Sequence, residues 1–134
     1  MTPVKAAIDR LRSDVCAFLR WTHALIQHLL LAIDRRTGSY RAAAFGVRLA
    51  WCFGARVTVL FVVAPASPYA TPDDEPHSHE ALDVGERVFR RIRRMAAAAG
   101  VPCVCLYAFG RNSPMIVSEA AAANQCDLIV LNAP

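Results

Sequence analysis

Two runs of apolar residues stand at either end of a helical pattern in the first half of the chain. The runs cover residues 28–34 and 56–63, and apolar residues recur at helical spacing between them. Strands that are apolar at nearly every position are typical of parallel sheets covered on both faces. The pattern therefore predicts a strand–helix–strand unit, with Asp34 at the carboxyl end of its first strand, where open parallel sheets bind ligands.

The alternation of strands and helices continues through the second half of the chain. Residues 80–99 and 114–124 are predicted helices, and residues 101–109 and 127–131 are predicted strands. Four prolines and an acidic cluster make residues 64–79 a predicted surface loop. This order of elements predicts an α/β fold, in which an open parallel sheet of four strands carries helices on both faces.

Helical spacing also predicts which side chains of the helices face the sheet. In the helix that follows Asp34 these are Ala42, Phe45, Leu49 and Phe53. In the helix at residues 80–99 they are Leu82, Gly85, Val88, Phe89, Ile92, Met95, Ala96 and Ala99. We interpret both stripes as core positions.

A further amphipathic helix precedes the first strand, with apolar residues at helical spacing from Val4 to Leu25. We therefore divide the chain into an N-terminal amphipathic helix, residues 1–27, and an α/β domain, residues 28–134. The apolar stripe of the helix could lie on the sheet, on a second subunit or on a membrane surface. Acids and bases are mixed on the opposite face, which favours packing against protein.

The composition excludes several classes of protein. With 134 residues, of which 55% are hydrophobic, the chain suits one globular domain that buries its own core. No apolar run approaches the ~18 residues of a membrane span, and the charges within residues 1–27 are unlike those of a secretory signal. We therefore expect a cytoplasmic protein with no membrane span.

Five cysteines occur without a CxxC motif, which is typical of free thiols in a reducing compartment. Cys103 and Cys105 share a face of their predicted strand and could bind a metal ion, but no second pair completes a tetrahedral site. His77 and His79 could chelate a cation together with nearby acids, and we interpret them instead as solvated loop side chains. We therefore predict no metal centre.

Five arginines crowd one predicted helix of this chain, whose net charge is +4: Arg87, Arg90, Arg91, Arg93 and Arg94. A basic helix can contact phosphates or an acidic partner, but arginines opposite an apolar stripe commonly form a solvated face. The sequence contains no nucleic-acid recognition motif, and no set of Ser, His and carboxylate residues that suits catalysis. We therefore predict a protein that is not an enzyme and binds no nucleic acid.

Two segments of the sequence resemble the universal stress protein family. Residues 32–63, AIDRRTGSYRAAAFGVRLAWCFGARVTVLFVV, are similar to the opening of the family, where a strand ending in aspartate precedes a serine-bearing turn, a helix, a GA turn and a strand. Residues 110–134, GRNSPMIVSEAAAANQCDLIVLNAP, resemble the later glycine–proline and ADLIVMG block of the family. The resemblance extends over residues 28–132.

The resemblance implies a strand order of 3-2-1-4-5 and homodimerisation through the fifth strand. For one branch of the family it also implies binding of ATP or AMP at the tips of strands 1 and 4. Carried over by position, the adenosine end of such a site would contain Ala32, Asp34, Val62, Leu131 and Asn132. The Asp34 carboxylate could accept hydrogen bonds from a ribose hydroxyl or a purine amino group, or it could cap the following helix.

The sequence departs from the nucleotide-binding branch after strand 4. That branch carries a G-x2-G-x9-G-[ST] segment, whose backbone amides hold the phosphates, whereas Asn132, Ala133 and Pro134 follow strand 4 here. Arg35 and Arg36 also replace a usual Gly-Ser pair in the first turn. We therefore expect a sheet of order 3-2-1-4 without the fifth strand, and weak or no nucleotide binding.

Two functions remain open from the sequence. One is a non-catalytic stress-response regulator that acts through homodimerisation and contacts with another protein. The other is an ATP or AMP sensor whose phosphate loop is absent from this chain or supplied by a partner. In both cases the edge of strand 4 needs a cover, which we expect to be a second subunit or the N-terminal helix.

Overall fold

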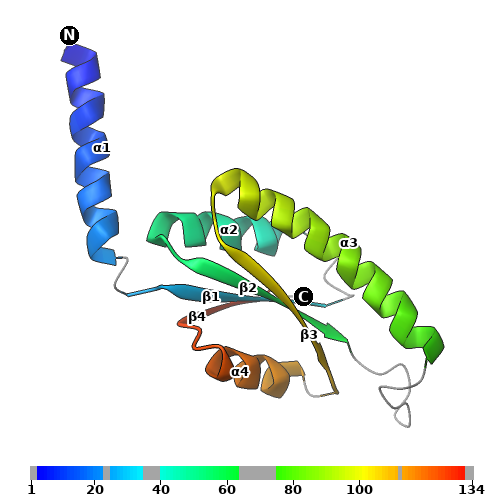
Figure 1. Cartoon of the computed structure of the whole chain (residues 1–134). Coiled ribbons are helices and arrows are strands. Elements are labelled where there is room, and N and C mark those ends of the chain that lie inside the picture. The colour runs from blue at the N-terminus through cyan, green and yellow to red at the C-terminus, as the bar shows by residue number, and fades with distance from the viewer. Residues whose placement is uncertain (1–2, 23–24, 35–39, 64–74, 112, 132–134) are drawn as a thin grey trace.

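The computed structural model describes residues 3–22, 25–34, 40–63, 75–111 and 113–131, apart from the side chains of residues 16–22 and 75–79. The elements follow in the order α1 (Pro3–Thr22), β1 (His28–Asp34), α2 (Arg41–Phe53), β2 (Arg56–Val63), α3 (Glu75–Ala99), β3 (Cys103–Phe109), α4 (Ser113–Ala123) and β4 (Leu128–Leu131). In Figure 1 the sheet is the middle layer, with α2 and α3 on one face and α4 on the other.

The sheet confirms the predicted order, β3-β2-β1-β4, and neighbouring strands are parallel. β1 lies between β2 and β4, and both of its faces are covered by helices. Leu29, Leu30 and Leu31 are consequently fully buried. This is the physical reason why β1 is apolar without alternation.

The sheet has a hydrophobic layer on each side. The larger layer lies under α2 and α3 and contains Leu31, Val59 and Phe61 from the strands with Phe89 and Ile92 from α3. The smaller layer, under α4, is built from Leu30, Ala32, Leu60, Val62, Val117 and Ala121. Alternate residues of β1 and β2 therefore enter different layers.

The prediction for the buried face of α3 is confirmed, and the prediction for α2 is partly wrong. Phe45 is 59% exposed. The buried residues of α2 are instead small ones: Ala42, Ala43, Gly46, Val47 and Ala50. A Cβ atom on Gly46 would lie only 3.5 Å from the Leu31 side chain, so α2 approaches the sheet too closely for a phenylalanine to fit between them.

The predicted loop at residues 64–79 is also too long at its carboxyl end. α3 begins at Glu75, five residues before the predicted start, and contains Pro76 in its first turn. A proline is tolerated there because the first amides of a helix have no partner within the helix. Residues 64–74 lie outside the described residues.

α1 stands away from the sheet (Figure 1). Val4, Ile8, Leu11 and Val15, which form its apolar stripe, are between 49% and 69% exposed. The expectation that this helix covers the edge of the fourth strand is therefore wrong for the described part of α1. None of the helices within the described residues has the length and hydropathy needed to cross a membrane.

Candidate functional site

The carboxyl ends of β1, β2 and β4 lie together at one end of the sheet. Asp34 at the end of β1 is paired with Val62 of β2, and Ala32 is paired with Leu131 of β4. Because paired residues of parallel strands point to the same face, these four residues all lie on the face that carries α4. The strand pairing thus brings together four of the five residues that the resemblance assigned to an adenosine site.

The four residues differ in what they could offer a ligand. Ala32 and Val62 are buried in the layer under α4, so only their backbone groups are placed for contact at the strand ends. Asp34 is half-buried, and Leu131 is 62% exposed. Asn132 lies outside the described residues, as do residues 35–39 and 64–74, which follow β1 and β2.

The structure also bears on the alternative role of Asp34 as a helix cap. The residue at the N-cap position of α2 is Tyr40, which makes no side-chain capping hydrogen bond. Asp34 therefore does not occupy the N-cap of this helix. Arg35 and Arg36, which replace the Gly-Ser pair usual in the family, fall outside the described residues.

A groove that the sequence did not predict lies beside β4. It has a volume of about 470 Å³ and is lined by Arg41, Ala42, Phe45 and Leu49 of α2 and by Leu128, Ile129, Val130 and Leu131 of β4. Among the described residues, no strand pairs with the outer side of β4. Backbone hydrogen-bonding groups and apolar side chains therefore stand together at this edge, which is the combination that favours pairing with another chain.

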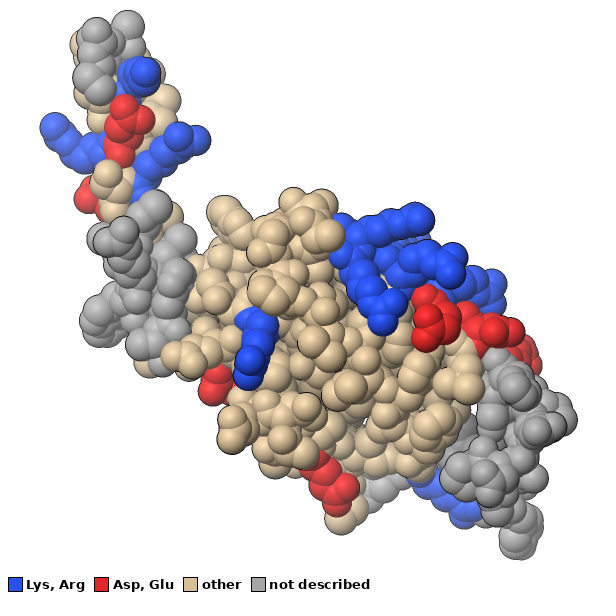
Figure 2. Space-filling model, viewed as in Figure 1, with Lys and Arg blue, Asp and Glu red and all other residues tan. Residues whose placement is uncertain are grey.

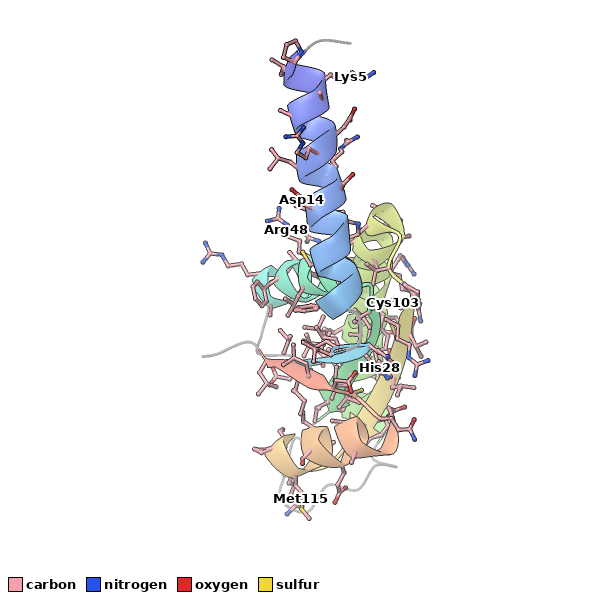
Figure 3. The ribbon with its side chains drawn as sticks, turned by 90° about the vertical axis from the view of Figure 1, so that its left-hand side faces the viewer. Lys5, Asp14, His28, Arg48, Cys103 and Met115 are labelled. Atoms are coloured by element: carbon pink, nitrogen blue, oxygen red, sulfur yellow. The ribbon has the colours of Figure 1, made fainter. Side chains whose placement is uncertain are left out.

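The opposite end of the sheet, where the strands begin, carries a second cluster of polar residues, of which Figure 3 labels His28. The Nε2 atom of the buried His28 is joined by a 2.6 Å hydrogen bond to Oγ1 of Thr58. Burial lowers the pKa of His28, and the charge of Arg56 lowers it further. A cavity of about 460 Å³ lies here, but the Asp127 carboxylate on its wall already accepts backbone hydrogen bonds, so we assign this cluster to the fold.

The basic side chains of α3 gather on one side of the molecule, next to acidic ones (Figure 2). Two of these arginines contact aromatic rings. The guanidinium of Arg91 lies 3.8 Å from the centre of the Tyr40 ring, and that of Arg93 lies 5.8 Å from the centre of the Phe89 ring. These contacts are consistent with a helix face on which the arginines are exposed to solvent and two of them also pack on aromatic rings.

Cys103 and Cys105 do share one face of β3, as the sequence predicts, and both are half-buried free thiols. The pKa of Cys105 is lowered, first by a hydrogen bond from Cys103 and then by Arg93. Among the residues that the structure describes, no group of three or more His, Cys, Asp or Glu side chains is placed to hold a metal ion.

The fold and these strand ends can be compared with known proteins. The family model of the universal stress protein family matches residues 26–133. Comparison with curated protein sequences found no significant match.

Several solved structures are similar to this fold. One, from the universal stress protein family of Burkholderia pseudomallei, has a TM-score of 0.70 at 20% identity, over 81% of this chain and 83% of that chain. A universal stress protein in complex with cAMP has a TM-score of 0.60 at 19% identity, over 79% and 75% of the two chains. A third, a universal stress protein family protein from Arabidopsis thaliana with AMP bound, has a TM-score of 0.54 at 14% identity, over 80% and 76%. From the family match and the shared fold, this chain belongs to the universal stress protein family.

Proposed function

We propose that this protein is a non-catalytic regulator of the stress response that acts by forming a homodimer and contacting another protein, with weak or no binding of nucleotides. The proposal places the protein in the cytoplasm. It also treats residues 1–27 as a segment separate from the α/β domain at residues 28–134.

The open edge of β4 carries this proposal. Leu131 is 62% exposed and Phe45 is 59% exposed, and both line the groove that runs along this edge. An added strand would satisfy the outer backbone groups of β4 and cover these apolar side chains at the same time. A second copy of the chain offers the same edge, so the two edges can pair around a twofold axis.

Sedimentation velocity over a range of concentrations tests the dimer. We expect the unmodified protein to be dimeric, and Leu131→Lys or Phe45→Lys to be monomeric because each places a charge in the buried interface. The matched control is Val104→Lys, since Val104 is 58% exposed on β3 at the other edge of the sheet. A monomer at every concentration, or a dimer that only Val104→Lys disrupts, would refute this interface.

A second candidate function is an ATP or AMP sensor whose phosphate loop is absent from this chain or supplied by a partner. It is supported by the two structurally similar proteins that hold cAMP and AMP. The grouping of Ala32, Asp34, Val62 and Leu131 on one face of the strand ends also supports it. In this function Asp34 would bind a ribose hydroxyl or the purine amino group, and Asn132 would follow Leu131 along the same site.

Calorimetry with ATP and AMP separates the two functions. The regulator is expected to give little heat with either nucleotide. The sensor is expected to bind in the micromolar range, to lose binding in Asp34→Ala and to keep it in Asp83→Ala, which changes an exposed acid on α3.

A further inference from the structure

The second edge strand of the sheet carries two thiols side by side. Cys103 and Cys105 are separated by one residue of β3, and they are paired with Val57 and Val59 of β2. Both thiols point to the face covered by α3 and pack against the larger hydrophobic layer. Side chains two residues apart on a strand lie on the same face, so the two thiols are neighbours on this face of β3.

Charges of both signs act on this pair, because the Glu86 carboxylate is also close to Cys105. Arg93 of α3 brings its positive charge close to both thiols, where it acts to lower the pKa of each. The next residue on the same face is Tyr107, whose ring lies 4.8 Å from the Phe89 ring, measured between ring centres. The pair therefore has an apolar wall along the strand and a cation above it, while it remains half-exposed to solvent.

The spacing of the two residues does not favour a disulfide between them. A strand rises about 3.3 Å per residue, so Cα atoms two residues apart are separated by roughly 6.6 Å. That separation is at the upper end of the range for disulfides, and side chains on one face of a strand leave in parallel directions. A metal ion held between two thiolates on opposite sides instead needs sulfur atoms roughly 4.6 Å apart, twice a metal–thiolate bond of about 2.3 Å.

The number and type of ligands select the ion. Zinc sites in proteins usually have four ligands, and within the described residues the pair has no third His, Cys, Asp or Glu placed to join it. Soft thiolate ligands select copper(I), which also accepts two ligands on opposite sides. We propose that Cys103 and Cys105 together bind one copper(I) ion per chain. Both thiols lose their protons on binding and copper keeps its +1 charge, so no oxidant or reductant is consumed.

Copper(I) titration of the reduced full-length chain without oxygen, in competition with the chromophoric chelator bicinchoninate, tests the site. The expected result is one ion withheld from the chelator per chain, with release of two protons for each ion at a pH below the pKa of both thiols. Cys103→Ser and Cys105→Ser should each abolish this binding, whereas Cys52→Ser and Cys126→Ser should retain it. Circular dichroism of each variant checks that it is folded. Equal binding by Cys103→Ser and the unmodified protein would overturn the proposal.

A second measurement needs no substitution. Bound copper(I) should protect Cys103 and Cys105 from alkylation by iodoacetamide, as read by mass spectrometry of the digested chain. Cys52 and Cys126 should react to the same extent with and without copper. A site within a single chain would be rejected by any of three results. Cys103 and Cys105 could react equally with and without copper, all four cysteines could be protected equally, or sedimentation could show one ion bound by two chains.

Discussion

Asp127 and His28 hold the starts of β4 and β1 together through hydrogen bonds in both directions. The Asp127 amide donates to the His28 carbonyl at 2.7 Å, and the His28 amide donates to the Asp127 carboxylate at 3.0 Å. The Gln27 amide donates to the same carboxylate oxygen at 2.8 Å. These bonds at the amino ends of the strands support the register that places Ala32 beside Leu131 near their carboxyl ends.

Asp127→Asn should destabilise the protein at neutral pH. The amides of Gln27 and His28 lower the pKa of the Asp127 carboxyl because they stabilise its charged form. Its contribution to stability is therefore present above the pKa of an unfolded aspartate, ~3.9, and is lost as the pH falls through the lower folded value. Urea unfolding midpoints of the two proteins should differ at pH 7 and converge at the acid end.

Asp83→Asn is the matched control for this prediction, because Asp83 is an exposed acid on α3. It should leave the urea midpoint nearly unchanged at both pH values. If Asp127→Asn unfolded at the same urea concentration as the unmodified protein at pH 7, the carboxylate would not anchor β4.

Thr58→Val should cost about 1–3 kcal/mol of stability, since it leaves the buried Nε2 of His28 without its hydrogen bond to Oγ1. Valine keeps the shape of threonine, so packing is changed little. The measurement is the free energy of urea unfolding for a double-mutant cycle with His28→Leu. Thr58→Val should have little effect in the His28→Leu background, and an undiminished effect there would assign the loss to something other than this hydrogen bond.

Gly85→Ala should destabilise α3 on the sheet, although alanine is ordinarily the better helix residue by about 1 kcal/mol. A Cβ at Gly85 would lie 2.6 Å from Cε1 of Tyr107. The Tyr107 ring cannot easily move aside, because its hydroxyl shares its one proton between Glu86 Oε1 at 2.9 Å and the Leu82 carbonyl at 3.2 Å. We expect a net loss of about 1–3 kcal/mol from overpacking in thermal or urea unfolding.

The double variant Gly85→Ala with Tyr107→Ala provides the check. Once the ring is removed, Gly85→Ala should become neutral or stabilising. If it stayed equally destabilising without the ring, the contact with Tyr107 would not explain why residue 85 is glycine.

Deletion of residues 1–15 should change the free energy of unfolding of the α/β domain by less than about 0.5 kcal/mol, the range of ordinary surface changes. The reason is that Val4, Ile8, Leu11 and Val15 are exposed, so their removal uncovers no core. Urea unfolding of the deleted and full-length chains measures this. A large loss of stability would mean that the apolar stripe packs against protein in solution, and sedimentation of the two chains would tell whether a second subunit is involved.

The candidate site was only partly predictable. The position of Asp34 followed from an apolar run that ends in a carboxylate, and its neighbours were carried over from the family resemblance. The groove beside β4 could not be found in this way. It depends on Phe45 being exposed, which helical spacing alone predicted wrongly.

What the sequence determined by itself was the order and type of the elements. The bounds of β1 and β2 match their predicted runs, because nearly every residue inside these strands is apolar and buried on one face or the other. The inward stripe of α3 was also predicted, since its large side chains, including Phe89 and Ile92, can be buried on only one face of the helix.

The tertiary structure decided how closely the elements approach and which strand ends meet. α2 buries its small residues because the sheet lies too near for a large side chain, and that distance is a property of the packed pair of elements. Likewise, Ala32, Asp34, Val62 and Leu131 share a face only because strand pairing sets their register. Spacing along the chain specifies the faces of one element, whereas contacts between elements exist only once distant segments have packed together.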